Sequence, residues 1–332
     1  MSRMSPMMLA VLAVLAVSCA GRAPKPEQKP EPPVVTRHMP LPPEKVRQLL
    51  ESGRIEVVSS ERAAGGVMGV AHAVARFPDV GATFEVKWKQ APENADGWNN
   101  TPRKELAAYD VQTWFLAEGD YVVPPSALRC IALETYLRTF PGATVNLPNA
   151  RCVLGLLTIW LEDVEVPKVL YDEDRFERDR EYARQLANLN ILLYLIDHRD
   201  AREGNILVSS DPEHYRAFSV DNGIAFGSLM YNFFRGHWNV IRVPALPRTS
   251  IARLRAVDRA VLDALGVVAE LHMDGEGIYR VVPDRAPLDR DLGVRLQPGH
   301  LQVGLTREEI EGVRERLRVL LARIDAGEIP LF

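Results

Sequence analysis

The spacing of apolar residues predicts a strand-rich first half of the chain and a helix-rich second half. Apolar residues at Phe84, Val86 and Trp88 place Lys87 and Lys89 together on the opposite face of one strand. The predicted strands cover residues 55–59, 70–77, 83–89 and 153–161. The predicted helices cover residues 44–52, 101–118, 176–196, 250–265 and 306–324.

The most informative segment contains two short apolar runs separated by a polar stretch. Residues 206–208 and 218–220 flank a turn, a pattern that predicts a β-hairpin. Pairing the two strands would bring Asn205 close to Asp221, and Asp200 lies five residues before Asn205. Two carboxylates and an amide at one end of a hairpin can hold a divalent cation and orient a hydroxyl group.

The N-terminus has the pattern of an export signal. Arg3 precedes eleven uninterrupted apolar residues, 7–17. As a helix these residues rise only about 16 Å, which is too short to span a bilayer. Residues 1–18 therefore indicate a secretory signal peptide. The sequence Ala16-Val17-Ser18-Cys19 resembles a bacterial lipobox, which implies that Cys19 is lipidated; the alternative is an ordinary cleaved signal with an incidental cysteine.

Residues 19–43 indicate a tether between this signal and the folded part of the chain. Of the chain's 24 prolines, eight lie between Pro24 and Pro43. Such a segment favours extended polyproline conformations and buries too little apolar surface to fold. The order of these parts predicts a domain held at a membrane of the bacterial cell envelope by its N-terminal lipid.

Composition and cysteine content narrow the classes of function. The chain has 332 residues, of which 47% are hydrophobic, and its formal net charge is −4, so it can bury a substantial core. It contains no basic block of the kind that favours nucleic-acid binding. In an exported protein, Cys130 and Cys152 predict a disulfide around a loop of about twenty residues. Two buried free thiols are the alternative.

The order of the polar motifs resembles the protein kinase-like fold. His198-Arg199-Asp200 with Asn205 resembles the kinase catalytic loop, and Asp221-Asn222-Gly223 resembles the metal-binding Asp-Phe-Gly motif with Asn in place of Phe. The latter form is similar to the atypical branch that includes phosphatidylinositol 3-/4-kinases and secretory-pathway Golgi kinases. Residues 103–109, followed by Val123-Pro124-Pro125, resemble the same branch.

This resemblance implies an α+β, bilobal fold, with a strand-rich N-lobe over 44–165 and a helical C-lobe over 166–332. It implies that Asp200 accepts the proton of an attacking hydroxyl group, or at least orients that hydroxyl group. Arg202 would neutralise the phosphate in transfer. Asn205 and Asp221 would ligate the Mg²⁺ or Mn²⁺ that bridges the nucleotide phosphates.

The resemblance also implies a nucleotide site in the first half of the chain. Lys87 would contact the α- and β-phosphates and form an ion pair with Glu105, although Lys89 on the same strand face is the alternative. The backbone around Glu162 would contact adenine in an interlobe hinge. The phosphates would be approached by backbone amides of a glycine-rich turn, for which a plain turn is the alternative; its glycines are Gly65, Gly66 and Gly69.

These features predict an exported, lipid-anchored atypical kinase. It would transfer the γ-phosphate of ATP to a hydroxyl group of an unknown protein or small-molecule acceptor. Little ATP is present outside the bacterial cytoplasm, so the main alternative is a catalytically silent, pseudokinase-type binding or scaffold lipoprotein. A third reading is transfer of another group, such as AMP, by the same fold.

Overall fold

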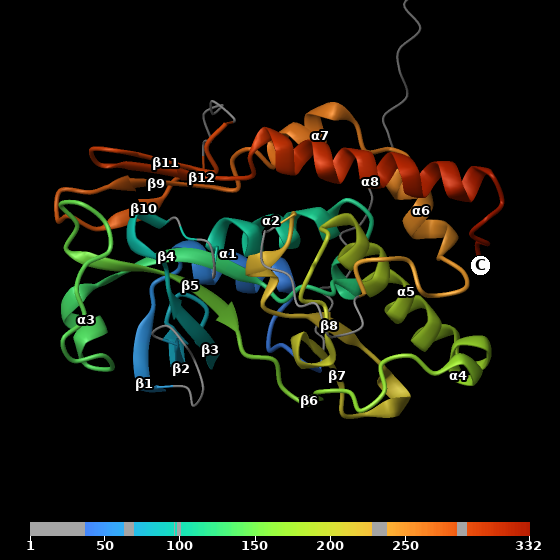
Figure 1. Cartoon of the computed structure of the whole chain (residues 1–332). Coiled ribbons are helices and arrows are strands. Elements are labelled where there is room, and N and C mark those ends of the chain that lie inside the picture. Colours follow the sequence, from blue (N-terminus) through green and yellow to red (C-terminus); the bar gives the residue numbers. More distant parts are fainter. Residues whose placement is uncertain (1–36, 63–69, 96, 98–100, 228–237, 284–290) are drawn as a thin grey trace, which may run out of the picture. The chain divides into compact units, whose positions relative to one another are not determined.

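The computed structural model describes residues 37–62, 70–95, 97, 101–227, 238–283 and 291–332. These residues belong to one compact unit and form a mixed α+β fold, with eight α-helices and three antiparallel sheets among the described residues (Figure 1). The expected signal peptide, Cys19 and the tether up to residue 36 lie outside the described residues, as do Gly65, Gly66 and Gly69.

A five-stranded sheet of the first half has the strand order β1-β2-β3-β5-β4. Its strands are β1 (Glu56–Arg62), β2 (Val70–Phe77), β3 (Ala82–Gln90), β4 (Ser126–Ala132) and β5 (Cys152–Ile159). The strands predicted in this region are all present. In β3 the predicted alternation is confirmed, because Phe84, Val86 and Trp88 are buried while Lys87 and Lys89 share the other face.

Strand β5 is buried on both faces because the sheet has apolar residues on each side. Helix α1 (Pro43–Ser52) contributes Val46 and Leu50 to the core cluster that contains Val153 and Leu157. The alternate residues of β5 belong to the second core cluster, which also contains helix α2 (Pro102–Thr113). A fully buried strand reads as a continuous apolar run, which is the pattern seen at 153–161.

Two of the predicted helices are each broken into two, and in both cases an aspartate begins the second helix. The prediction of one continuous helix over 176–196 was wrong. Helix α4 (Glu173–Arg178) ends before Asp179, and helix α5 (Arg180–Leu195) begins after it. The Asp179 carboxylate accepts hydrogen bonds from the backbone N–H groups of Glu181 and Tyr182. Because of this cap, starting a new helix at Arg180 is more stable than continuing α4 through Asp179.

The segment 250–265 divides in the same way, into α6 (Arg248–Leu254) and α7 (Arg259–Ala264), with Asp258 capping α7. The last helix, α8 (Arg307–Asp325), has the predicted capping box. In the described ranges, no helix combines the length and apolar character needed to cross a bilayer.

The predicted hairpin is confirmed. Strands β7 (Ile206–Ser209) and β8 (Ala217–Ser219) pair antiparallel, and β6 (Val164–Glu165) pairs with the outer edge of β7. The chain therefore leaves the five-stranded sheet at Ile159 and enters this three-stranded sheet at Val164.

The helix-rich second half was an incomplete expectation, because a four-stranded sheet lies within it. The strand order is β10-β9-β12-β11. The strands are β9 (Ala269–Met273), β10 (Tyr279–Val281), β11 (Val294–Gln297) and β12 (His300–Val303). In Figure 1 this sheet lies beside the β4 side of the five-stranded sheet, and β10 contacts β4.

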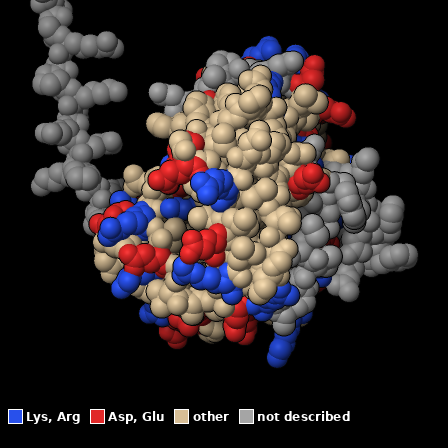
Figure 2. Space-filling model, turned by 90° about the vertical axis from the view of Figure 1, so that its left-hand side faces the viewer, with Lys and Arg blue, Asp and Glu red and all other residues tan. Residues whose placement is uncertain are grey.

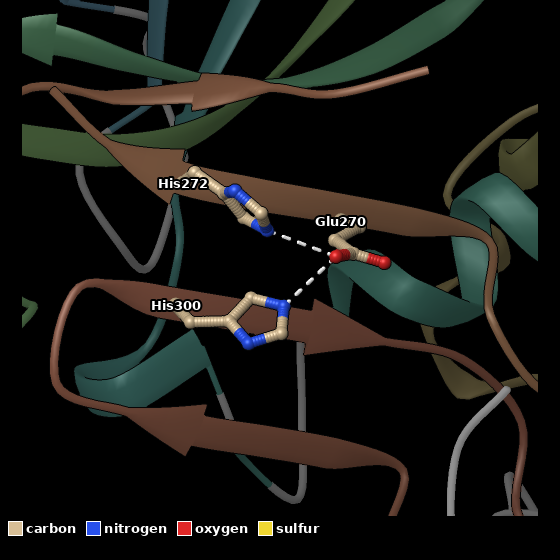
Figure 3. Close-up of side chains that lie close together, drawn as sticks. All are labelled: Glu270, His272 and His300. Carbon is tan, nitrogen blue, oxygen red and sulfur yellow. Dashed lines mark hydrogen bonds and ion pairs between the residues drawn. The ribbon is translucent and has the colours of Figure 1, made fainter. Parts of the chain in front are cut away.

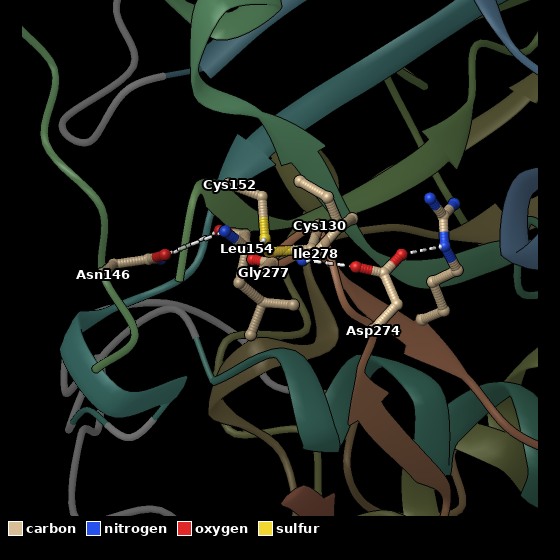
Figure 4. The surroundings of a disulfide bond; sticks show 8 residues. Cys130, Asn146, Cys152, Leu154, Asp274, Gly277 and Ile278 are labelled. Carbon is tan, nitrogen blue, oxygen red and sulfur yellow. Dashed lines mark hydrogen bonds and ion pairs between the residues drawn. A yellow bond between two sulfur atoms is a disulfide. The ribbon is translucent and has the colours of Figure 1, made fainter. Parts of the chain in front are cut away.

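The predicted disulfide between Cys130 and Cys152 is confirmed, and it joins β4 to β5 (Figure 4). Its sequence separation is 22 residues. Closing a loop of this length stabilises the fold by about 3 kcal/mol in the chain-entropy model. Short helix α3 (Leu133–Leu137) lies inside the loop, and the buried side chain of Asn146 bonds both backbone groups of Leu154.

The surface carries charges of both signs. Figure 2 shows Lys and Arg side chains interspersed with Asp and Glu on one face of the molecule, with no extended patch of a single sign in that view.

Candidate functional site

The open end of the β7–β8 hairpin brings Asn205 and Asp221 close together. The ladder pairs Ile206 with Ser219, and the Val220 N–H donates to the Asn205 carbonyl at 2.9 Å. Ile206 and Phe218 are fully buried, so the strand register is fixed by the core. The predicted convergence of the two residues at one end of the hairpin is therefore a property of the fold.

The loop before the hairpin is closed by its own side chains. The Asn205 Nδ2 donates to the backbone carbonyl of Asp200 and to its Oδ2, both at 2.8 Å. The Arg202 Nε donates to Oδ1 of the same aspartate at 3.1 Å. Asp200, Arg202 and Asn205 thus form one connected cluster, as their spacing in the catalytic-loop motif suggests.

His198, at the start of this loop, is a buried and neutral residue. Its side chain is fully buried, and burial lowers the pKa of its imidazole to about 4, although the negative charges of Asp200 and Asp221 act in the opposite direction. At neutral pH the ring is uncharged and has no access to solvent. It therefore cannot serve as a solvent-facing base.

Two lysines of β3 meet the carboxylate of Asp221. The Lys87 Nζ lies 2.8 Å from the Asp221 Oδ1, and the Lys89 Nζ lies 3.6 Å from the same oxygen. Burial opposes ionisation of Asp221, but the two ammonium groups outweigh it and hold the pKa of this carboxyl below its ordinary value. Asp221 is therefore an anion with two cations directed at it.

Glu105 lies on the other side of Asp221, in the first turn of α2. Its Oε2 accepts a hydrogen bond from the Asn222 backbone N–H at 2.8 Å. Burial raises the pKa of the Glu105 carboxyl, opposed by the nearby charges of Lys89 and Lys87. The ion pair expected between Lys87 and Glu105 is thus replaced, between these described residues, by a Lys87–Asp221 pair and a Glu105–Asn222 hydrogen bond.

Helix α2 also holds the segment that follows Asp221. The Lys104 Nζ donates to the Ala225 carbonyl at 2.8 Å and pairs with the Glu309 carboxylate of α8 at 3.1 Å. Neighbouring residues Lys104 and Glu105 therefore fix the chain at two points, at Ala225 and at Asn222. Sequence analysis did not identify Lys104 as part of this arrangement.

The turn at Val122-Val123 is tied to the same helix. The Gln112 side chain is fully buried; its Oε1 accepts from the N–H groups of Val122 and Val123, and its Nε2 donates to the Val123 carbonyl. The Val122 carbonyl in turn accepts from the Ser219 N–H of β8 at 2.7 Å. These contacts connect α2 to the hairpin through the Val-Pro turn noted in the sequence.

Glu162 lies in the connection between the two sheets, where a hinge was expected, but its backbone is already bonded. The Glu162 N–H donates to the His38 carbonyl at 3.2 Å, and the Glu162 carbonyl contacts the His38 Nδ1 at 2.8 Å. A base that used these two groups would have to displace His38. The sequence carries no local signal for this contact, because the two residues are 124 positions apart.

The residues predicted for phosphate, metal and hydroxyl contacts lie in two neighbouring contact groups at the open end of the hairpin, apart from Glu162 and the three glycines. Five segments contribute to these groups: β3, the start of α2, the loop at 198–205, the hairpin end and the 3-10 turn η5 (Asn222–Ile224). One contact group contains Asp200, Arg202 and Asn205. The other contains Lys87, Lys89 and Asp221, with Glu105 bonded to the adjacent Asn222. The backbone bond from the Val220 N–H to the Asn205 carbonyl connects the two groups.

No protein-family model matches the chain, and no curated protein is significantly similar to it.

Proposed function

We propose that the chain is a metal-dependent phosphotransferase with a bilobal, protein kinase-like fold. The observation that carries the proposal is the pairing of two β3 lysines with Asp221 beside the Asp200–Asn205 loop. Glu105 of α2 accepts a hydrogen bond from the next residue, Asn222. Two carboxylates, an amide and two ammonium groups at one place suit a metal-bound polyphosphate.

The donor atoms of the site fit Mg²⁺ or Mn²⁺. Asp221 is ionised, because its pKa is lowered despite burial. The Asn205 Nδ2 is directed to Asp200, so its Oδ1 is the atom that it offers to a cation. Carboxylate and amide oxygens are the ligands that these hard cations prefer. When bound, the metal would neutralise phosphate charge and align the γ-phosphate of ATP.

The chain's own residues would then divide the work of transfer. Asp200 takes the proton of the acceptor hydroxyl while that oxygen forms a bond to the γ-phosphorus; the bond to the β–γ bridging oxygen breaks, and ADP leaves. Arg202 and Lys87 offset negative charge on the phosphates.

The acceptor is a hydroxyl group of a protein or a small molecule. The expected signal peptide and lipobox support a proposed site of activity at a membrane of the cell envelope, where donor nucleotide must be supplied. The same site without turnover would be a scaffold, and transfer of AMP would use the same nucleotide position.

The test is transfer of label from γ-labelled ATP by the purified full chain with Mg²⁺ or Mn²⁺, read by intact mass on the chain and on added protein acceptors. Phosphoryl transfer adds roughly 80 Da. Asp200→Asn and Asp221→Asn are each expected to lower the rate by a factor of about 100 or more. Asp211→Asn, in the loop of the same hairpin, is the matched control and is expected to retain activity.

Label transfer that persists in both the Asp200→Asn and the Asp221→Asn variant would show that this site does not catalyse the reaction. A nucleotidyl adduct would instead show that AMP is the transferred group. Nucleotide binding without transfer to the chain, to a protein or to a small molecule would identify the chain as the scaffold form.

A further inference from the structure

The β9–β12 sheet carries a second cluster of polar residues, separate from the proposed phosphotransfer site. On β9, Glu270 and His272 are two residues apart and share one face; on β12, the same holds for His300 and Gln302. The strand register pairs His300 with His272 and Gln302 with Glu270. The four residues therefore form a square on one face of two adjacent strands. Figure 3 draws three of them, Glu270, His272 and His300.

The three atoms that could ligate a metal already lie close together. The His272 Nε2 and the His300 Nε2 each lie 2.9 Å from the same carboxylate oxygen, Glu270 Oε1. Figure 3 shows both imidazoles directed at this oxygen. The ligand atoms of the three residues all lie within 4.8 Å of one another. In a tetrahedral zinc site with bonds of about 2.0–2.1 Å, ligand atoms are roughly 3.3 Å apart, so a few tenths of an ångström of opening would admit an ion.

Burial and supporting contacts also resemble those of a metal site. The Glu270 side chain is only 4% exposed, whereas those of His272 and His300 are 53% and 30% exposed. The other carboxylate oxygen of Glu270 accepts from the Gln302 Nε2 at 2.8 Å, which fixes the orientation of the carboxylate. Glu270 is thus a buried, oriented anion, and the two imidazoles that contact it are more exposed.

The geometry points to a binding site for a divalent transition metal of the zinc type, held by Glu270, His272 and His300. Two imidazoles and one carboxylate are a ligand set that zinc uses when its fourth position is open. The ligands are on paired strands whose inward residues Leu271 and Leu301 are fully buried, so the strand register is fixed by the core. The ion would cross-link β9 to β12 at this face.

Zinc binding tests this proposal directly, with the metal alone as the probe. The full chain, stripped with a chelator, is titrated with Zn²⁺ and followed by calorimetry and by thermal unfolding. One ion per chain is expected at this site, with a rise in unfolding temperature of roughly 5 °C at 100 times the dissociation constant. His272→Ala, His300→Ala and Glu270→Gln are each expected to weaken it at least tenfold.

The matched control is His214→Ala, because His214 is comparably exposed and pairs with Asp211 at 2.9 Å in an unrelated loop. It should leave zinc affinity unchanged. X-ray absorption of the zinc-loaded chain should show two imidazoles in the ligand shell. Zinc affinity that is absent, or that is unaffected by both the His272 and His300 variants while they remain folded, would show that the cluster is a hydrogen-bonded network only.

Discussion

Asp221 lies in the left-handed region of backbone space, with φ 56° and ψ 52°, while its carboxylate lies between two lysines. This conformation costs a non-glycine residue roughly 1–2 kcal/mol, although aspartate tolerates it better than most. The Glu105 bond to the next N–H and the lysine contacts hold the residue there. Backbone strain maintained by surrounding contacts is typical of functional sites.

The buried imidazole of His198 makes the free energy of unfolding depend on pH. The pKa of His198 is about 4 in the folded chain and 6.5 when unperturbed, so between these values the unfolded state binds a proton that the native state does not. Stability from this residue is therefore present above pH 6.5 and is lost as pH falls toward 4, by about 3 kcal/mol in total.

Urea unfolding at pH 7 and pH 5 measures this effect. The native chain should lose roughly 2 kcal/mol more over this interval than His198→Gln, which has no proton to bind. An equal loss in the two proteins would mean that His198 is not held neutral in the fold.

At the level of secondary structure, the helix breaks depend on local capping. Asp179 bonds two N–H groups of α5 and also pairs with Arg175 of α4 at 3.0 Å. Asp179→Ala is expected to lower the free energy of unfolding by about 1 kcal/mol, because the first turn of α5 loses its cap.

The control for this prediction is Glu177→Ala, on the exposed surface of α4. It should change stability by less than about 0.5 kcal/mol. Denaturant unfolding of both variants decides the question; equal stabilities would show that Asp179 does not set the helix start.

Sequence patterns predicted those elements whose apolar period and end signals agree. The hairpin at 206–219 and the capped helix α8 are examples. The helix period alone could not place the break at Asp179. An aspartate within a helical pattern is consistent either with a helix cap or with a surface residue inside one helix. Strands β9 to β12 were missed because each has only three to five residues, too few for alternation to be distinctive.

Across the whole molecule, the candidate site depends on contacts between distant segments. Lys87 and Asp221 are 134 positions apart, and Asn222 is 117 positions from Glu105. The hairpin pattern predicted that Asn205 and Asp221 meet, since neighbouring strands fix their register. No local pattern shows that Lys87 pairs with Asp221 and not with Glu105, or that His38 occupies the backbone groups of Glu162, because those pairings follow from tertiary packing.

The proposed nucleotide site at Asp221 is tested most directly by the affinity of the full chain for a non-hydrolysable ATP analogue with Mn²⁺, determined by calorimetry. The native chain should bind one nucleotide, and Asp221→Asn should weaken binding at least tenfold, or about 1.4 kcal/mol. Lys87→Met should weaken binding more than Lys89→Met does, since its ammonium group lies nearer to Asp221, whereas Asp211→Asn should have no effect. A native chain that binds no nucleotide, or an Asp221→Asn variant that binds it equally well, would contradict the proposed site.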